Sequence, residues 1–445
     1  MHYGVIGAGA LGLTAALRLA QHGHEVTVFE RDPVPGGLAG SFEAAPGIWL
    51  EKFYHHLFRT DNNARRVIEE LGLGPKLRWH EPVTTVFLDG RSHPLDTPSA
   101  VLRFTPLSFA NRLRLAAGVG LLKVMPRPGP LERQTAGRWM RRVMGGPVFH
   151  TVWQPLLRGK FGDAADDISM AWLWARIHCR TAKLGYLQGG FHQVYVALSQ
   201  RVQELGGSIV YGASATEFRP RAGGIEVAYR QGQADHVATF DRVISTLATA
   251  LTVKLTPDMP AEYAARYPAP RAFGAHCLVL ALDRQLTDVY WIGINEPDMP
   301  FLAVVEHTNM VPADEYGGRH LIYFGNYRPH DDPLFSMTTQ HVLDAFEAGI
   351  RRLNPAFDRS WISESWSFGV PFAQPIVTPE FARTIPPFDT PIDGLYTANM
   401  FQVYPYDRGQ NYSIGLAERL VRHLEDAAGT APSKAERSGQ TEGAA

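Results

Sequence analysis

The sequence predicts an α/β protein with two parts: a domain on a parallel sheet that is discontinuous in sequence, and an α+β domain with a mixed or antiparallel sheet and helices. Three observations support this expectation. The chain has 445 residues, which is longer than a domain with a single hydrophobic core usually is. It begins with a strand, a glycine-rich turn, a helix and a second strand, which is a unit of a parallel sheet. Later strand-like runs follow one another closely, as antiparallel strands do.

The composition restricts the class of protein. Hydrophobic residues make up 45% and charged residues 20% of the chain, and a net charge of −1 provides no field that would attract nucleic acid. Cys179 and Cys277 form no CxxC pair, so we expect thiols in a reducing compartment and no metal site. Met1 leads directly into a strand without a signal peptide, and no apolar run is long enough to cross a bilayer, which favours a cytoplasmic protein.

The stretch MHYGVIGAGALGLTAALRLAQHGHEVTVFE predicts a Rossmann-type dinucleotide site. Gly7, Gly9 and Gly12 form G-x-G-x-x-G between a strand and a helix that continues to about His22. In such a loop the first glycine permits a tight turn, the second lets a pyrophosphate approach the backbone, and the third lets the helix pack on the strand. Glu30 ends the next strand, where a carboxylate accepts hydrogen bonds from the adenosine ribose. A glycine-rich turn without a ligand is the alternative, which the order of the elements disfavours.

A second glycine pair, Gly36 and Gly37 in RDPVPGGLAGS, follows at once. With it, the first forty residues resemble the extended dinucleotide signature of the FAD-dependent superfamily of amine oxidases, protoporphyrinogen oxidase, phytoene desaturases and UDP-galactopyranose mutase. The resemblance implies FAD as the cofactor, with the glycine pair close to the pyrophosphate and the flavin. Many members have a basic residue after the pair, whereas this chain has Leu38, which fits the desaturase-like and mutase-like branches better.

The resemblance also implies that the far end of the chain contributes to the FAD site. DGLYTANMFQVYPYDRGQNYSIGLAERLVRHL predicts a strand, a polar loop and an amphipathic helix, with Asp407, Arg408 and Gly409 before the helix. Asn399 stands where the family has an acid, and it can still donate to the pyrophosphate or accept from the ribityl chain. A surface helix packed on a strand, without a role in FAD binding, is the alternative.

A middle segment fits the same family. GYLQGGFHQVYVALSQRVQELGGSIVYGASATEF predicts a glycine turn, a helix over residues 191–205 and a strand from Ser208, and GIEVAYR and HVATFDRVISTLAT predict further strands. The resemblance implies a backbone contact from this hairpin to the adenine end of FAD, which we place at Ala215. The residues expected to bind FAD, without a covalent bond, are Gly7, Gly9, Ala10, Gly12, Glu30, Arg31, Gly36, Gly37, Leu38, Ala215, Asn399, Arg408, Gly409, Asn411 and Tyr412.

The remaining segments predict the substrate domain. LRWHEPVTTVFLDGRSHPL reads as two extended runs joined by the turn Asp89-Gly90, and FGAHCLVLALD, VYWIGI, FLAVVEH and RHLIYFGNY read as strands. TQHVLDAFEAGIRRL reads as a helix. We therefore expect the FAD-binding domain over residues 1–75, 190–250 and 385–425, the substrate domain over 76–189 and 251–384, and a disordered tail over 426–445.

Two segments supply candidate active-site residues. In EKFYHHLFRTD, His55 and His56 follow the glycine pair, and in related desaturases and mutases a loop with histidine lies over the flavin ring. We favour His56 as a hydrogen-bond partner of the flavin or a proton shuttle, with a packing role as the alternative. In WQPLLRGKFGDAADDISMAWLWARIHCR, cations among tryptophans predict a pocket for anionic or carbonyl groups, although a core helix with solvated arginines is slightly favoured. The candidates are His56, Lys160 and Arg176 for catalysis, and Arg158, Trp174, Tyr327 and Tyr404 for a small-molecule substrate.

The sequence leaves the function open between three classes. The first is an FAD-dependent oxidoreductase of amine oxidase or desaturase type that removes a hydride from an organic substrate. The second is a mutase-like rearrangement of a nucleotide-sugar-like substrate, with Arg158 and Arg176 on the diphosphate. The third, a flavin-binding protein without activity, is disfavoured by the polar residues of the expected pocket. Because only one G-x-G-x-x-G occurs, we expect electrons to leave for oxygen, a quinone or another protein.

The stretch TPLSFANRLRLAAGVGLLKVMP is apolar with a few basic residues. It predicts either a buried helix that roofs the pocket, which we favour, or an interfacial helix in peripheral contact with the inner face of a membrane. In membrane-associated relatives the corresponding domain forms the entrance for an apolar substrate.

Overall fold

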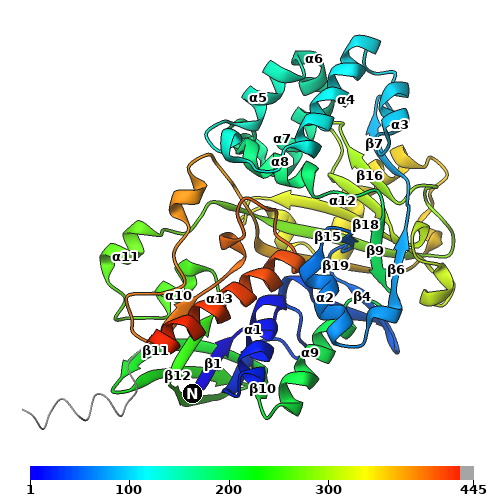
Figure 1. Cartoon of the computed structure of the whole chain (residues 1–445). Coiled ribbons are helices and arrows are strands. Elements are labelled where there is room, and N and C mark those ends of the chain that lie inside the picture. The colour runs from blue at the N-terminus through cyan, green and yellow to red at the C-terminus, as the bar shows by residue number, and fades with distance from the viewer. Residues whose placement is uncertain (431–445) are drawn as a thin grey trace, which may run out of the picture.

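The structure is a computed structural model that describes residues 1–430. In Figure 1 a parallel sheet lies at the bottom, a larger sheet crosses the middle, and a group of short helices lies at the top. Residues 426–430, expected to begin a disordered tail, instead continue the last helix, α13 (Gln410–Thr430). The rest of that expected tail lies outside the described residues.

The lower sheet is parallel throughout and is discontinuous in sequence, as predicted. Its strands, in spatial order, are β10 (Ser208–Tyr211), β2 (Glu25–Glu30), β1 (His2–Ile6), β14 (Arg242–Ser245) and β20 (Leu395–Thr397). On one face pack α1 (Ala10–Gln21), α9 (His192–Glu204) and α13, whose apolar residues form one core with the sheet. The other face is covered by an antiparallel sheet of β11 (Ala213–Arg221), β12 (Gly224–Gln231) and β13 (Ala234–Phe240). The central strand β1 is therefore buried on both faces, which explains its continuous apolar run.

The middle sheet has seven strands and is antiparallel except for one parallel pair. In spatial order it contains β19 (Ile362–Pro375), β15 (Ala272–Leu282), β18 (His320–Arg328), β17 (Ala303–Glu306), β16 (Trp291–Ile294), β7 (Thr84–Leu88) and β8 (Arg91–Pro94). The strand β15 alternates strictly: Leu278 and Leu280 face a core with α12 (Thr339–Leu353), whereas Cys277 and Val279 face the core shared with the parallel sheet. This sheet thus links the two halves, whose residue boundaries stay a prediction.

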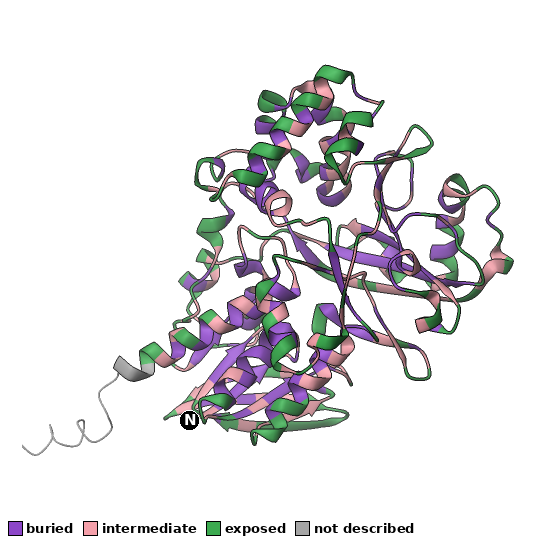
Figure 2. Ribbon diagram, turned by 45° about the vertical axis from the view of Figure 1, so that its right-hand side comes forward, coloured by how far each residue is buried: buried purple, intermediate pink, exposed green. Residues whose placement is uncertain are grey.

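The helices at the top of Figure 1 form a cap with its own core. They are α3 (Pro98–Arg103), α4 (Phe109–Val124), α5 (Ala136–Val143), α6 (Gly146–Val148), α7 (Gln154–Phe161) and α8 (Met170–His178). Figure 2 shows much exposed surface on this cap, in contrast to the buried strands of the parallel sheet. Among the described residues, the helices are too short or too polar for any of them to cross a bilayer.

One expected hairpin is shorter than predicted. The first run of LRWHEPVTTVFL is broken at Pro82, which lacks the backbone N–H that a continuing ladder needs. Its first part, β6 (Leu77–His80), leaves the hairpin and pairs with β9 (Leu184–Leu187) beside β5 (Leu57–Phe58). The second part, β7, forms the expected hairpin with β8, and Asp89 and Gly90 at the turn have φ values of 53° and 71°.

Two strands and three helices lie around these sheets. They are the hairpin of β3 (Ser41–Ala45) and β4 (Ile48–Glu51), the helix α2 (Asn62–Glu70) beside α13, and the short helices α10 (Thr249–Lys254) and α11 (Ala261–Arg266).

Candidate functional site

A cavity of about 1500 Å³ extends from the glycine loop after β1 to the helical cap. The structure brings together at its wall all fifteen residues expected to bind FAD, although they come from segments far apart in sequence. They are Gly7, Gly9, Ala10, Gly12, Glu30, Arg31, Gly36, Gly37, Leu38, Ala215, Asn399, Arg408, Gly409, Asn411 and Tyr412. The three candidate catalytic residues, His56, Lys160 and Arg176, line the same cavity.

The three glycines of the loop are required for different reasons. Gly7 has a φ of +108°, which favours glycine. A Cβ on Gly12 would lie 1.9 Å from the carbonyl oxygen of Gly7, so only glycine lets α1 pack this closely. By contrast, Gly9 has an ordinary φ of −81°, and the nearest atom to an added Cβ is 3.8 Å away, on Gly37. The protein leaves the space at Gly9 open, which fits the close approach of a pyrophosphate.

Glu30 connects the second strand to the glycine loop. Its Oε2 accepts a hydrogen bond of 2.7 Å from the Ala8 N–H, and its Oε1 accepts one of 3.0 Å from the Asp32 N–H. Burial raises the pKa of this carboxyl, while the two backbone donors oppose the shift. Each carboxylate oxygen keeps a further acceptor site, so Glu30 fits a ribose as well as positioning the loop.

The loop before α13 is held by its own hydrogen bonds. Asn399 accepts from the Phe401 N–H at 3.1 Å and donates to Thr249 Oγ1 at 3.1 Å, so it caps a short 3₁₀ turn. Contact of Asn399 with FAD stays a prediction. Residues 410–413, the first turn of α13, line the cavity, where N–H groups without an intrahelical partner suit an anionic or carbonyl ligand.

The two histidines of the loop after β4 are neutral. His56 shares a hydrogen bond of 3.2 Å with the Tyr290 hydroxyl, and His55 donates to the Phe53 carbonyl at 2.6 Å. Burial, followed by the charge of Arg180, lowers the pKa of His56 to about 3, and burial lowers that of His55 to about 4. Burial thus disfavours the charged form of His56, and its role as a hydrogen-bond partner of the flavin or as a proton shuttle stays a prediction.

The candidates Lys160 on α7 and Arg176 on α8 meet at Asp407. The Asp407 carboxylate lies 3.2 Å from Lys160 Nζ and 2.5 Å from Arg176 Nη1, and it accepts from the Trp172 indole N–H at 3.3 Å. Burial would raise the pKa of Asp407, but Lys160 and Arg176 hold it well below its usual range. Burial and then Arg176 lower the pKa of Lys160 to about 8. Trp172 and Arg176 share a helix face, as their i, i+4 spacing predicts.

Tyr327 extends this cluster toward β18. Its hydroxyl accepts a hydrogen bond of 2.8 Å from Arg408 Nη2, and Lys160 Nζ lies 4.8 Å from the ring centroid. Burial alone would raise the pKa of Tyr327, but Arg408 and Lys160 lower it to about 8. The guanidinium of Arg408 also donates to Gln374 Oε1. Two groups with pKa values near neutral thus lie together on the cavity wall, a combination typical of catalytic sites.

Sequence reasoning missed the central role of Asp407. The residue was noted only as part of the loop before α13, yet it joins Lys160, Arg176 and Trp172. The one available signal was an Asp-Arg-Gly run directly before an amphipathic helix.

The three other candidates for substrate contact lie elsewhere. Arg158 is exposed on α7, two residues from Lys160 and so on a different helix face. Trp174 is buried in the cap, donates to the Met125 carbonyl at 3.1 Å and stacks on His178. Tyr404 packs beside Phe381 at the edge of the cap core. The three side chains are therefore not part of the cavity lining, and their contact with a substrate stays a prediction that this placement does not support.

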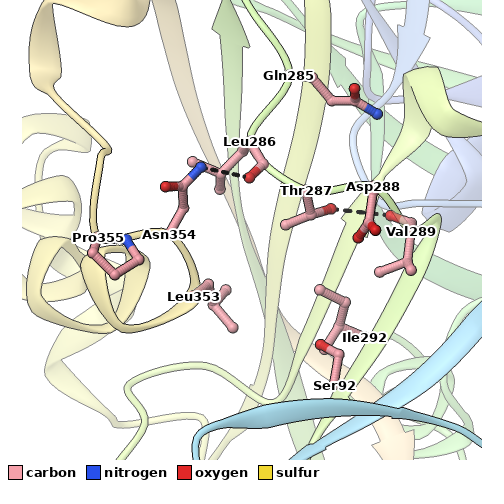
Figure 3. Close-up of a pocket in the computed structure, with 10 residues that line it drawn as sticks. All are labelled: Ser92, Gln285, Leu286, Thr287, Asp288, Val289, Ile292, Leu353, Asn354 and Pro355. Carbon is pink, nitrogen blue, oxygen red and sulfur yellow. Dashed lines mark hydrogen bonds between the residues drawn. The ribbon is translucent and has the colours of Figure 1, made fainter.

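A second, smaller cavity of about 410 Å³ lies between the segment 285–289 and the end of α12 (Figure 3). Two of its polar side chains bond to the protein itself: Asn354 donates to the Leu286 carbonyl at 2.9 Å and Thr287 to the Val289 carbonyl at 3.1 Å. Within residues 1–430, no three His, Cys, Asp or Glu side chains gather as metal ligands do. The large cavity is therefore the candidate site.

Comparisons with known proteins agree with this assignment. The sequence model of the family described as flavin-containing amine oxidoreductase matches residues 12–404. A protein of Mycobacterium tuberculosis assigned as a flavin-containing monoamine oxidase is 29% identical over 289 residues, which span 58% of this chain and 60% of that protein. A 15-cis-phytoene desaturase of Synechococcus elongatus is 24% identical over 324 residues, 65% of this chain and 67% of the desaturase.

Solved structures share the fold. A protein of Exiguobacterium assigned as a protoporphyrinogen oxidase superposes with a TM-score of 0.74 at 16% identity, covering 95% of this chain and 98% of its own. A reduced UDP-galactopyranose mutase gives 0.73 at 16% identity, covering 97% and 96%. These likenesses confirm the predicted Rossmann-type fold, and the branch suggested by Leu38 stays a prediction. By the match over most of its length, the chain belongs to the flavin-containing amine oxidoreductase family, whose cofactor FAD fits the cavity described above.

Proposed function

We propose that this protein is an FAD-dependent oxidoreductase that oxidises or desaturates a small organic substrate. One observation carries the proposal: a single cavity joins the glycine loop and the fifteen expected FAD-binding residues to the cluster of Lys160, Asp407 and Tyr327. When bound, FAD supplies the acceptor for a hydride from a substrate C–H bond. The protein supplies the position of the substrate, the exclusion of water and a place for the proton released with the hydride.

Lys160 is the proposed proton acceptor. Its pKa of about 8 leaves a fraction of the amine neutral near pH 7, and Nζ has a free electron pair in that form. Asp407 holds the side chain at 3.2 Å, and Arg176 shares the same carboxylate, so the amine stays oriented while its charge changes. Arg408 and Tyr327 form the neighbouring wall and fix the loop that begins α13.

Two alternatives receive less support. A mutase-like reaction required Arg158 and Arg176 together on a diphosphate, but Arg158 is exposed outside the cavity wall. The likeness to the mutase structure concerns the fold alone. A flavin-binding protein without activity is disfavoured because Lys160 and Tyr327, with pKa values of about 8, lie together in the cofactor cavity, as catalytic groups do.

Two experiments test the proposal: the identification of the bound cofactor and the measurement of which compounds reduce the flavin. We expect a yellow protein that releases intact FAD on denaturation, because neither Cys179 nor Cys277 lies in the C-terminal flavin segment. A colourless protein that FAD does not reconstitute contradicts the assignment. In anaerobic stopped-flow mixing, NADH and NADPH should bleach the flavin slowly, whereas a true substrate bleaches it quickly. Fast bleaching by a nicotinamide would instead favour a reductase or a reduced-flavin mutase.

We also propose that the helical cap binds the surface of an anionic membrane. The helix α4 exposes an apolar stripe at i, i+4 and i, i+3 spacing, with exposures of 64% at Phe109, 47% at Leu113, 45% at Leu121 and 77% at Val124. Residues 98–143 carry nine Lys or Arg and one Glu. Apolar residues flanked by cations suit a surface of anionic lipid.

The other face of α4 supports an entrance at this surface. Leu115, Val119 and Lys123 of the same helix line the large cavity, so α4 contributes both to the apolar stripe and to the cavity wall. The membrane proposal is tested by sedimentation with vesicles of phosphatidylcholine, with and without phosphatidylglycerol. Replacing Phe109 and Val124 by serine should weaken binding by about tenfold or more, while Val237→Ser on β13 should not. Equal binding by both variants, or no preference for the anionic lipid, contradicts it.

A further inference from the structure

The cavity cation Arg180, next to the cap helix α8, is unlike its neighbours Arg176, Lys160 and Arg408. Arg180 follows α8, and its side chain is exposed to the cavity that it lines. Across the described residues 1–430, its guanidinium makes no hydrogen bond and no ion pair. Burial, followed by Arg176, lowers its pKa only to about 10, so it remains a cation at neutral pH. Its five N–H donors face the cavity without an acceptor from residues 1–430 and are available to a ligand there.

The other cations of this region are already satisfied. Arg176 and Lys160 share Asp407, and Arg408 donates to Tyr327 and Gln374. Each therefore has a role in building the wall. Arg180 differs from them because, within residues 1–430, no side chain forms an ion pair or a hydrogen bond with its guanidinium, although Asp96 and Tyr290 lie close enough to favour its charged form.

A second cation lies behind Arg180. Lys123 of α4 donates through Nζ to the backbone carbonyls of Arg180 and of His178, the latter at 3.4 Å. The His178 carbonyl ends α8 and the Arg180 carbonyl follows the helix, so the ammonium is bound by carbonyl dipoles rather than by a carboxylate. The nearby carboxylates have other partners: Asp96 accepts from the Thr84 N–H, and Glu81 pairs with Lys183. The backbone donor leaves the charge of Asp96 in place, and the two cations Arg180 and Lys123 outnumber this one carboxylate.

The cavity that Arg180 lines also has apolar walls. Val101, Leu115, Val119, Leu156 and Leu302 line it, and Val119 lies one helical turn from Lys123 on α4. A ligand that matches both regions has an apolar body and one anionic group. A cationic amine would meet Arg180 and Lys123 as like charges in a space with little water, which is unfavourable.

We propose that Arg180, supported by Lys123, binds an oxyanion of the substrate, a carboxylate or a phosphate, carried on an apolar body. This subsite rests on the proposed oxidoreductase function and gives it a substrate class that excludes simple cationic amines. The planar guanidinium suits either oxyanion through two parallel N–H donors.

The test is isothermal titration calorimetry of the FAD-loaded protein with decanoate, decyl phosphate and decylamine. We expect both anions to bind at least about tenfold more tightly than the amine, and the tighter of the two identifies the oxyanion. Arg180→Gln should weaken anion binding by about tenfold or more, and Arg180→Lys should retain most of it. Arg158→Gln on the exposed face of α7 is the matched control and should bind as the original protein does.

Melting temperature and FAD content are measured for each variant, so that a folding defect is separated from a lost subsite. If Arg180→Gln folds, holds FAD and binds decanoate as before, the subsite is overturned while the oxidoreductase proposal stands. Equal binding of decylamine and the anions overturns it as well. A protein that never retains FAD overturns the proposed function, whereas its anion titration still decides the subsite.

Discussion

The two ends of the large cavity differ in the chemical groups that form their walls. At the parallel sheet, the wall is backbone: three glycines, the Ala8 N–H bonded to Glu30, and the first turn of α13. At the cap, the wall consists of charged side chains, where Lys160 and Arg176 both form ion pairs with Asp407. The first end recognises a ligand by shape and by N–H groups, while the second adjusts charge and proton affinity.

This difference teaches where each end is vulnerable. A backbone site fails when an atom is added, because main-chain groups have no room to move aside. A site of paired charges fails when one charge is removed, because the partner stays buried without compensation. Substitutions at each end of the cavity can therefore distinguish the two kinds of failure.

The largest effect is expected for Gly12→Ala. Its Cβ would lie 1.9 Å from the carbonyl oxygen of Gly7, so α1 cannot keep its place on β1 and little folded protein should be obtained. The matched change Gly9→Ala meets no protein atom closer than 3.8 Å. It should fold with an unchanged melting temperature and bind FAD about tenfold or more weakly. A Gly9→Ala protein with full FAD affinity would show that the pyrophosphate lies elsewhere.

The next effect is expected for Asp407→Asn. The change leaves Lys160 and Arg176 without a counter-charge in a buried position, so urea denaturation should show a loss of about 3 kcal/mol in the free energy of unfolding. Asp235→Asn breaks an exposed pair with Arg230 and serves as the control, with little change expected. Equal losses for the two variants would mean that the cluster is an ordinary surface pair.

Glu30→Ala should affect the cofactor more than the fold. The ribose loses a charged acceptor, and the Ala8 and Asp32 N–H groups lose theirs, so FAD affinity should fall by about 1.5–3 kcal/mol in fluorescence titration. Glu30→Gln keeps a carbonyl oxygen and should lose less. Unchanged FAD retention by both variants would contradict the assigned ribose contact.

The smallest effect is a dependence on pH. Because burial and Arg176 lower the pKa of Lys160 to about 8, the neutral amine becomes more abundant as pH rises through that value. The rate of flavin reduction by substrate should therefore rise with pH up to about 8 and then level off. Lys160→Met should remove this rising limb. Tyr327→Phe removes the second group with a pKa near 8, and the rate in this variant should still rise with pH. If the rise disappears in Tyr327→Phe, Tyr327 is the proton acceptor.

Local sequence determined the parallel-sheet end almost completely. The glycine loop, the helix to His22, Glu30 and the helix over residues 191–205 were predictable, because each depends on backbone sterics or on an apolar period within a few tens of residues. The strands of the three-stranded sheet β11–β13 and most strands of the middle sheet were predictable from alternating or continuous apolar runs. Pro82 was the exception, where a missing N–H divided a run that composition alone described as one strand.

The cap end was decided by the tertiary structure. The sequence supplied lysine, arginine, tryptophan and tyrosine as candidates, but Lys160 and Asp407 are 247 residues apart, and only the packing of α7 and α8 against the last loop joins them. The same packing exposes Arg158, buries Trp174, and leaves Arg180 facing the cavity. The sequence determines which titratable groups the chain contains. Their pKa values depend on burial and on the distance between charges, and these two quantities exist only in the folded protein.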